Sequence, residues 1–147
     1  MFGLDAQLLL RLFGITFIAL GLAARLGVWK NWYWRSRGTV YGYIPLGLLF
    51  IVYSFNALAV ARLGSYYILY QGLFVLLIVW GLWWTVHPPI FIKPIWVRWV
   101  EAYPKEVFDT IVKAVEQGEK WEAHVVSPEK LELWVKSLRA KKRRSKG

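Results

Sequence analysis

The sequence has no cysteine and almost no acidic residues in its first 100 positions. The absence of cysteine excludes disulfides, thiolate catalysis and cysteine-ligated metals. Asp5 is the only acidic residue before position 101. Catalysis needs several titratable groups that converge in a protected site, so we expect no enzyme activity. The two histidines, His87 and His124, are far apart in the sequence and predict neither a metal site nor a cofactor.

Long stretches of the chain also lack charge of either sign. No Lys, Arg, Asp or Glu occurs from Gly38 to Ala61 or from Leu63 to Ile92. A first apolar block, up to Ala24, contains Arg11 as its one charged residue. A helix needs about 20 apolar residues to cross the hydrocarbon core of a bilayer. The spacing predicts an all-α integral membrane protein, and the expected three-span region covers residues 1–89, with transmembrane helices at about 7–28, 41–61 and 66–87.

Basic residues in short connections predict the orientation of the spans, because they favour the cytoplasmic side. Those in the first connection and just after the third span are Arg25, Lys30, Arg35, Arg37, Lys93, Arg98 and Lys105. They predict an outer N-terminus and a cytoplasmic C-terminus in a multi-pass protein of a prokaryotic-type plasma membrane. The tryptophans near the same inner interface are Trp29, Trp32, Trp34, Trp80, Trp83, Trp84, Trp96 and Trp99. They predict an anchoring belt, with a docking face for a partner as the alternative.

The two amide side chains of the second and third spans fall at one depth. The short connection at residues 62–65 predicts an antiparallel hairpin, and its midpoint places Asn56 and Gln71 level. We expect an interhelical hydrogen bond between them, which in membranes is worth about 0.6 kcal/mol. The alternative is a polar pocket, which Arg11 would join if it faced the bundle instead of snorkelling to the headgroups. Asn56, Gln71 and Arg11 are the candidate intramembrane polar cluster.

Small residues at helical spacing predict where the spans pack closely. The two stripes, one on the first span and one on the second, are Ala19, Ala23 and Gly27, and Ser54, Ala57 and Ala61. They indicate packing within the bundle, with contact to a partner as the alternative.

The third span ends at His87, because the prolines that follow disfavour helix in the residue before them. Residues 90–103 then predict an interfacial amphipathic helix on the inner leaflet, since apolar side chains recur on one face. The candidate interfacial docking residues are Trp96, Trp99, Arg98 and Lys93.

Residues 104–138 predict a small cytoplasmic helical region. Apolar stripes run from Val107 to Val115 and from Leu131 to Leu138, and Ser127 before Pro128 predicts a helix N-cap. Residues 139–147 form a basic tail, interpreted either as a solvated end or as a contact for anionic lipid. The candidate anionic-lipid contacts are Arg139, Lys141, Lys142, Arg143, Arg144 and Lys146.

These features favour a noncatalytic small membrane protein that acts as an accessory subunit, assembly factor or tether. Its inner face would dock a membrane protein partner, a second copy or anionic inner-leaflet lipid. The alternative is an oligomeric transporter or channel for a small solute or lipid, built on the Asn56 and Gln71 pair. Nucleic acid is not expected as a partner, because no stacking aromatics alternate with the basic residues of the tail.

Overall fold

The computed structural model describes residues 5–35 and 37–145, and every regular element within them is helical. The chain divides into two compact units, one that ends at Ile92 and one that begins at Lys93. Two helical stretches are long and apolar enough to cross a membrane, Ala6–Arg25 and Asn56–Val86. Both belong to the first unit.

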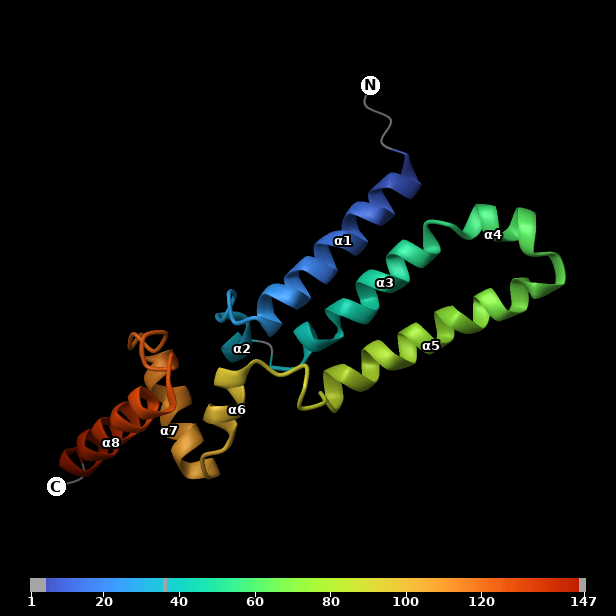
Figure 1. Ribbon diagram of the computed structural model, residues 1–147. Helices are drawn as coiled ribbons and strands as arrows, with labels where there is room; N and C mark the ends of the chain where they lie inside the picture. Colours follow the sequence, from blue (N-terminus) through green and yellow to red (C-terminus); the bar gives the residue numbers. More distant parts are fainter. Residues whose placement is uncertain (1–4, 36, 146–147) are drawn as a thin grey trace. The chain divides into compact units, whose positions relative to one another are not determined.

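Three helices of the first unit form a layer in which the middle helix separates the outer two (Figure 1). They are α1 (Ala6–Arg25), α3 (Tyr43–Tyr53, preceded by a 3-10 turn at Thr39–Gly42) and α5 (Tyr67–Val86), with α3 in the middle. Asp5 is the N-cap of α1, and its side chain accepts a hydrogen bond from the backbone N–H of Gln7 at 3.2 Å.

Glycines bring the backbones of α1 and α3 into direct contact. A Cβ atom on Gly14 would lie 2.7 Å from the carbonyl oxygen of Gly47, and one on Gly47 would lie 2.5 Å from that of Gly14. Gly21, seven residues further along α1, packs against a side chain, since a Cβ there would lie 2.7 Å from Cγ1 of Ile44. Small residues allow such close approach, and packing of this kind drives helix association in membranes.

The predicted small-residue stripes are therefore wrong in their residues. Ala19 is exposed, and Gly27 lies beyond the end of α1 with a φ of 75°. On the second span Ala57 is exposed, whereas Ser54 is buried. The error arises because the glycine face of α1, and not its alanine face, fits against α3.

The second predicted span is broken into two helices. α3 ends at Tyr53, and α4 (Asn56–Leu63) begins after Ser54 and Phe55. The helical segment Thr39–Tyr53 is shorter than the two membrane-length stretches, and falls short of the roughly 30 Å of a hydrocarbon core. Because of this break, the prediction of one continuous helix over residues 41–61 is wrong.

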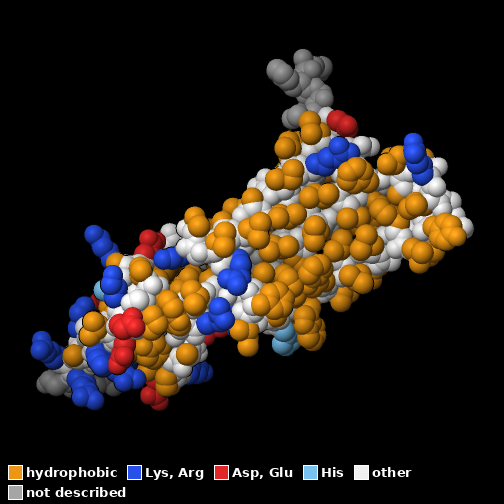
Figure 2. All heavy atoms as spheres, viewed as in Figure 1, with side chains coloured by type: hydrophobic (Ala, Val, Ile, Leu, Met, Phe, Trp, Pro, Cys, Tyr) orange, Lys and Arg blue, Asp and Glu red, His pale blue; other side chains and the backbone are white. Residues whose placement is uncertain are grey.

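α5 buries very little of its surface. Leu77 is its one buried residue, whereas Ile68, Val75 and Leu82 are exposed. Hydrophobic side chains cover the visible face of the helical layer (Figure 2). Soluble monomers rarely expose apolar surface on this scale, which is typical of a membrane or a protein interface.

Some of the expected tryptophan belt lies in the core instead. Trp32 belongs to the short helix α2 (Trp32–Arg35) and is buried together with Tyr33. The Trp32 ring lies 5.2 Å from that of Tyr41, in an edge-to-face arrangement. These aromatic side chains pack the first unit, because each offers the other a large apolar contact.

The second unit contains α6 (Ile95–Glu101), α7 (Lys105–Glu116) and α8 (Pro128–Arg144). The largest side chains that are fully buried in this unit are Ile111, Leu131, Val97, Val100 and Val125. Both predicted stripes contribute to this core, since Val107 and Ile111 are buried on α7 and Leu131 and Leu138 on α8.

Local signals set the ends of these helices. Gly118, with a φ of 81°, follows the end of α7, where a left-handed residue terminates a helix. Ser127 is the N-cap of α8, as predicted, and its Oγ accepts from the backbone N–H of Lys130 at 3.3 Å. Pro128 occupies the first helical position, as predicted, where its missing N–H costs nothing.

The basic tail begins inside a helix, which corrects the boundary predicted at residue 138. α8 continues to Arg144, so residues 139–144 form its last turns. Cationic side chains are stabilised at a helix C-terminus, because they face the negative end of the helix dipole. Lys146, a predicted lipid contact, lies outside the described residues.

Candidate functional site: a helix break and a basic groove

Side chains satisfy the backbone where α3 ends. The Oγ of Ser54 donates to the carbonyl oxygen of Ile51 at 2.7 Å, and the hydroxyl of Tyr70 donates to that of Val52. The same two carbonyls also accept from the backbone N–H groups of Ser54 and Phe55, each at 3.1 Å, so each has a backbone donor and a side-chain donor. Ser54 is 1% exposed. We call this region, with Arg11, Phe55 and Asn56, the helix break.

Arg11 of α1 reaches the helix break from the side. Its Nε donates to the Oγ of Ser54 at 3.2 Å, and its guanidinium carbon lies 4.6 Å from the centre of the Phe55 ring. A guanidinium at this distance over a ring is held by a cation–π interaction. The side chain therefore lies against the end of α3, the inward position that the sequence left as an alternative to snorkelling.

The structure gives Asn56 a different partner from the one expected. The Asn56 Oδ1 accepts from the hydroxyl of Tyr67 at 2.9 Å, and Gln71 is exposed. The rings of Tyr53 and Phe74, which the predicted hairpin register places level, lie 5.7 Å apart. The hydroxyl hydrogen bonds of Tyr67 to Asn56 and of Tyr70 to Val52 instead join residues about one helical turn away from that register.

Sequence reasoning missed Ser54 as a polar contact, because a serine in an apolar run was interpreted as a small packing residue. It did not identify Tyr67 and Tyr70 as hydrogen-bond partners. The signal available was the pair of neighbouring hydroxyl and amide groups, Ser54 and Asn56, within an otherwise apolar stretch. Such polar groups favour a local break, because a serine hydroxyl can bond a nearby backbone carbonyl.

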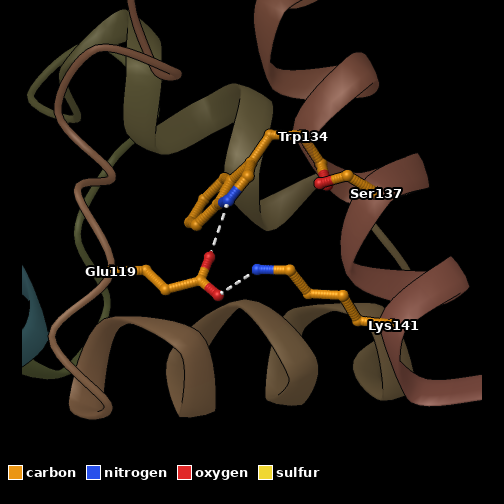
Figure 3. Close-up of polar contacts among 4 residues, drawn as sticks. All are labelled: Glu119, Trp134, Ser137 and Lys141. Atoms are coloured by element: carbon orange, nitrogen blue, oxygen red, sulfur yellow. Dashed lines mark hydrogen bonds and ion pairs between the residues drawn. The ribbon is translucent and has the colours of Figure 1, made fainter. Parts of the chain in front are cut away.

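In the second unit, Glu119 joins the segment after α7 to α8 (Figure 3). Its Oε1 accepts from the Nζ of Lys141 at 2.8 Å, and its Oε2 accepts from the indole N–H of Trp134 at 3.2 Å. The bond from Lys141, followed by that from Trp134, lowers the pKa of the Glu119 carboxyl, because both donors stabilise its charged form. The ring of His124 stacks on that of Trp134, with centroids 5.0 Å apart.

A groove of about 590 Å³ lies beside this carboxylate. We call it the basic groove, and the residues that line it are Glu119, Lys120, His124, Lys130, Leu133, Trp134, Ser137 and Lys141. Three lysines face one carboxylate, so the groove is cationic. Leu133 is 66% exposed among them, which gives the groove an apolar contact as well.

The chain matches no family model, no curated protein and no solved structure. Its function is therefore argued from the geometry of these two regions. Within residues 5–35 and 37–145, no group of three or more His, Asp or Glu side chains could hold a metal ion.

The docking residues expected on the inner segment serve the second unit instead. Trp96 is buried, with its ring 5.6 Å from that of Trp121. Lys93 forms an ion pair with Glu101. Trp96 is therefore not available as an exposed docking residue, whereas docking through the other candidates stays a prediction. The other two candidates, both half-buried, are Arg98 and Trp99.

The predicted lipid contacts on α8 fall into two groups. Lys141 is engaged by Glu119. Those that are exposed at the end of the helix are Arg139, Lys142, Arg143 and Arg144. Two of the three groove lysines, Lys130 and Lys141, lie on α8 together with this basic helix end, so α8 carries most of the cationic surface of the second unit.

Proposed function

We propose that the protein is a noncatalytic, multi-pass membrane protein whose C-terminal unit docks onto an anionic surface, as an accessory subunit, assembly factor or tether. The observation that carries this proposal is the cationic surface of α8, which combines the basic groove with the basic helix end. A compact unit with such a surface, attached to apolar helices, suits attachment better than chemistry.

The membrane placement is supported by the first unit. α1 and α5 each have membrane length, and the pair α3 and α4 forms the third crossing in two pieces. The exposed apolar surface of α5 would face lipid, which needs no polar partner. The excess of basic residues in the first connection favours an outer N-terminus and a cytoplasmic second unit.

Anionic lipid of the inner leaflet is the occupant that the basic groove favours. Each lysine near an anionic membrane contributes about 1 kcal/mol, and the exposed Leu133 adds apolar contact with the acyl boundary. An acidic protein surface is the second possible occupant. The transporter alternative is less well supported, because Gln71 does not share a hydrogen bond with Asn56.

The absence of cysteine permits a site-specific test. The full chain, with Ser137→Cys in the basic groove, carries an environment-sensitive dye and is reconstituted into liposomes. We expect a blue-shifted emission in phosphatidylglycerol vesicles relative to phosphatidylcholine vesicles, because docking places the dye in an apolar environment. A dye at exposed Glu116→Cys on α7 serves as the positional control.

A charge-matched pair of double variants decides whether the groove itself is responsible. Lys120→Ala with Lys130→Ala removes two charges from the groove, and Lys105→Ala with Lys113→Ala removes two from α7. The first pair should abolish the blue shift and the second should leave it. Equal losses would show that only net charge matters, and an unchanged shift in both would refute lipid docking through the groove. A protein that copurifies in mild detergent and is lost only with the first pair would favour the acidic partner.

A further inference from the structure

Arg11 is a cation that has no carboxylate to pair with in its own unit. Asp5 is the only acidic residue of that unit, and its side chain caps α1 by accepting from the backbone of Gln7. Lys93, Lys136 and Lys141 form ion pairs with carboxylates of the second unit. A charge held within a membrane segment is costly and is normally paired or functional. Asp5 forms no ion pair with Arg11, so an anion from outside the first unit could supply its counter-charge.

The geometry of the helix break leaves the guanidinium ready for an anion. Ser54 accepts from Nε, and the Phe55 ring supports the guanidinium plane. A guanidinium has five N–H donors in a rigid fork, so the four on its terminal nitrogens remain to bind a ligand. Arg11 lies five residues, or about 7.5 Å, inside the start of α1. A long arginine side chain at that depth is within reach of the headgroup level.

We propose that the helix break is a phosphate-binding site in which Arg11 donates two N–H groups to phosphate oxygens, with Ser54 and Phe55 fixing the guanidinium. Arginine forks match phosphate in a bidentate manner. The phosphodiester of a phospholipid headgroup is the ligand that this depth favours, and free phosphate is the other source of the same chemistry. The site is separate from the basic groove and is independent of the proposed docking function.

Lipid retention by the full chain tests this site. The protein is purified in mild detergent, incubated with phosphatidylglycerol, and its bound lipid is counted by native mass spectrometry. We expect Arg11→Gln to weaken retention at least about tenfold, because it removes two charge-assisted hydrogen bonds and the loss of one alone has an effect of that size. Arg62→Gln, which removes an exposed cation of α4, should retain lipid as the wild type does. Ser54→Ala keeps the charge of Arg11 but removes the hydroxyl that accepts from its Nε, so it should show a smaller loss of bound lipid.

Two further arms identify the ligand. A galactolipid, which lacks phosphate, should bind to wild type and Arg11→Gln equally. Displacement of phosphatidylglycerol by millimolar inorganic phosphate would assign the site to a free anion, and failure to displace it would assign the site to lipid. The proposal is overturned if Arg11→Gln, folded by circular dichroism, retains phosphatidylglycerol like the wild type. It is also overturned if Arg62→Gln loses as much bound phosphatidylglycerol as Arg11→Gln does. Galactolipid binding that falls as strongly in Arg11→Gln as phosphatidylglycerol binding does would overturn it too.

Discussion

The contact between α1 and α3 predicts that Gly47→Ala destabilises the first unit. The added Cβ would lie 2.5 Å from the carbonyl oxygen of Gly14 and 3.0 Å from the backbone nitrogen of Ile18. Backbone atoms within a helix cannot rotate away as a side chain can, so the two helices would have to separate. Separation would also loosen the contact between Gly14 and Ile51, which lies along the same line.

The expected magnitude follows from two opposing effects. Overpacking a well-fitted interior costs about 1–3 kcal/mol, and a clash this short against backbone belongs in the upper part of that range. Replacing glycine with alanine in a helix recovers up to about 1 kcal/mol of helix propensity. We therefore expect a net loss of about 1–2 kcal/mol in the free energy of unfolding.

Gly72→Ala on α5 is the matched control. A Cβ at Gly72 meets no atom within 4 Å, so this variant has the propensity gain without the clash. The two variants should differ by about 2–3 kcal/mol, measured by titrating the full chain from mild detergent into sodium dodecyl sulfate and following helicity. Equal stability of Gly47→Ala and the wild type would refute the close packing of α1 on α3. Equal changes in the free energy of unfolding of Gly47→Ala and Gly72→Ala would also refute this close packing.

Two predictions concern the second unit. The pKa of Glu119 is lowered in the folded state, so its contribution to stability is complete above the ordinary carboxyl pKa and is lost as the pH falls through the folded value. The second unit should therefore unfold at a lower temperature on acidification below about pH 4.5. Glu119→Gln should reduce this dependence of the unfolding temperature on pH. An unchanged pH profile in this variant would contradict the role of Lys141 and Trp134. Ser127→Ala removes the N-cap of α8 and should cost about 0.5–2 kcal/mol in the free energy of unfolding, with Ser145→Ala at the far end of α8 as a near-neutral control. If the two serine variants unfolded at the same temperature, the cap would not contribute.

The sequence predicted the features that depend on long windows or on neighbouring residues. Apolar blocks with little or no charge identified α1 and α5, because membrane length is a sum over about 20 residues. The cap at Ser127 followed from a bond within a few residues. The apolar stripes of α7 and α8 followed in the same way, since helical spacing places their residues on one face.

The candidate site was predicted only in part. Arg11 and Asn56 were singled out because they are polar residues in apolar spans, and both lie at the helix break. Their partners, Ser54 and Tyr67, were not identified, because a hydroxyl group is common in membrane helices and its partner is set by the packing of a second helix. The basic groove was not foreseen at all, since its lysines come from separate segments.

By itself, the sequence determined where apolar helices form, which segment is rich in basic residues, and that the first unit contains one acidic residue. Tertiary packing decided the rest. At the break, the hydroxyl of Tyr70 on α5 donates to the carbonyl oxygen of Val52, a contact between two helices that are separate in the sequence. The inward position of Arg11 depends on glycine contacts that place α1 level with that break. Such contacts join residues distant in the sequence, so a pattern of neighbouring residues does not contain them.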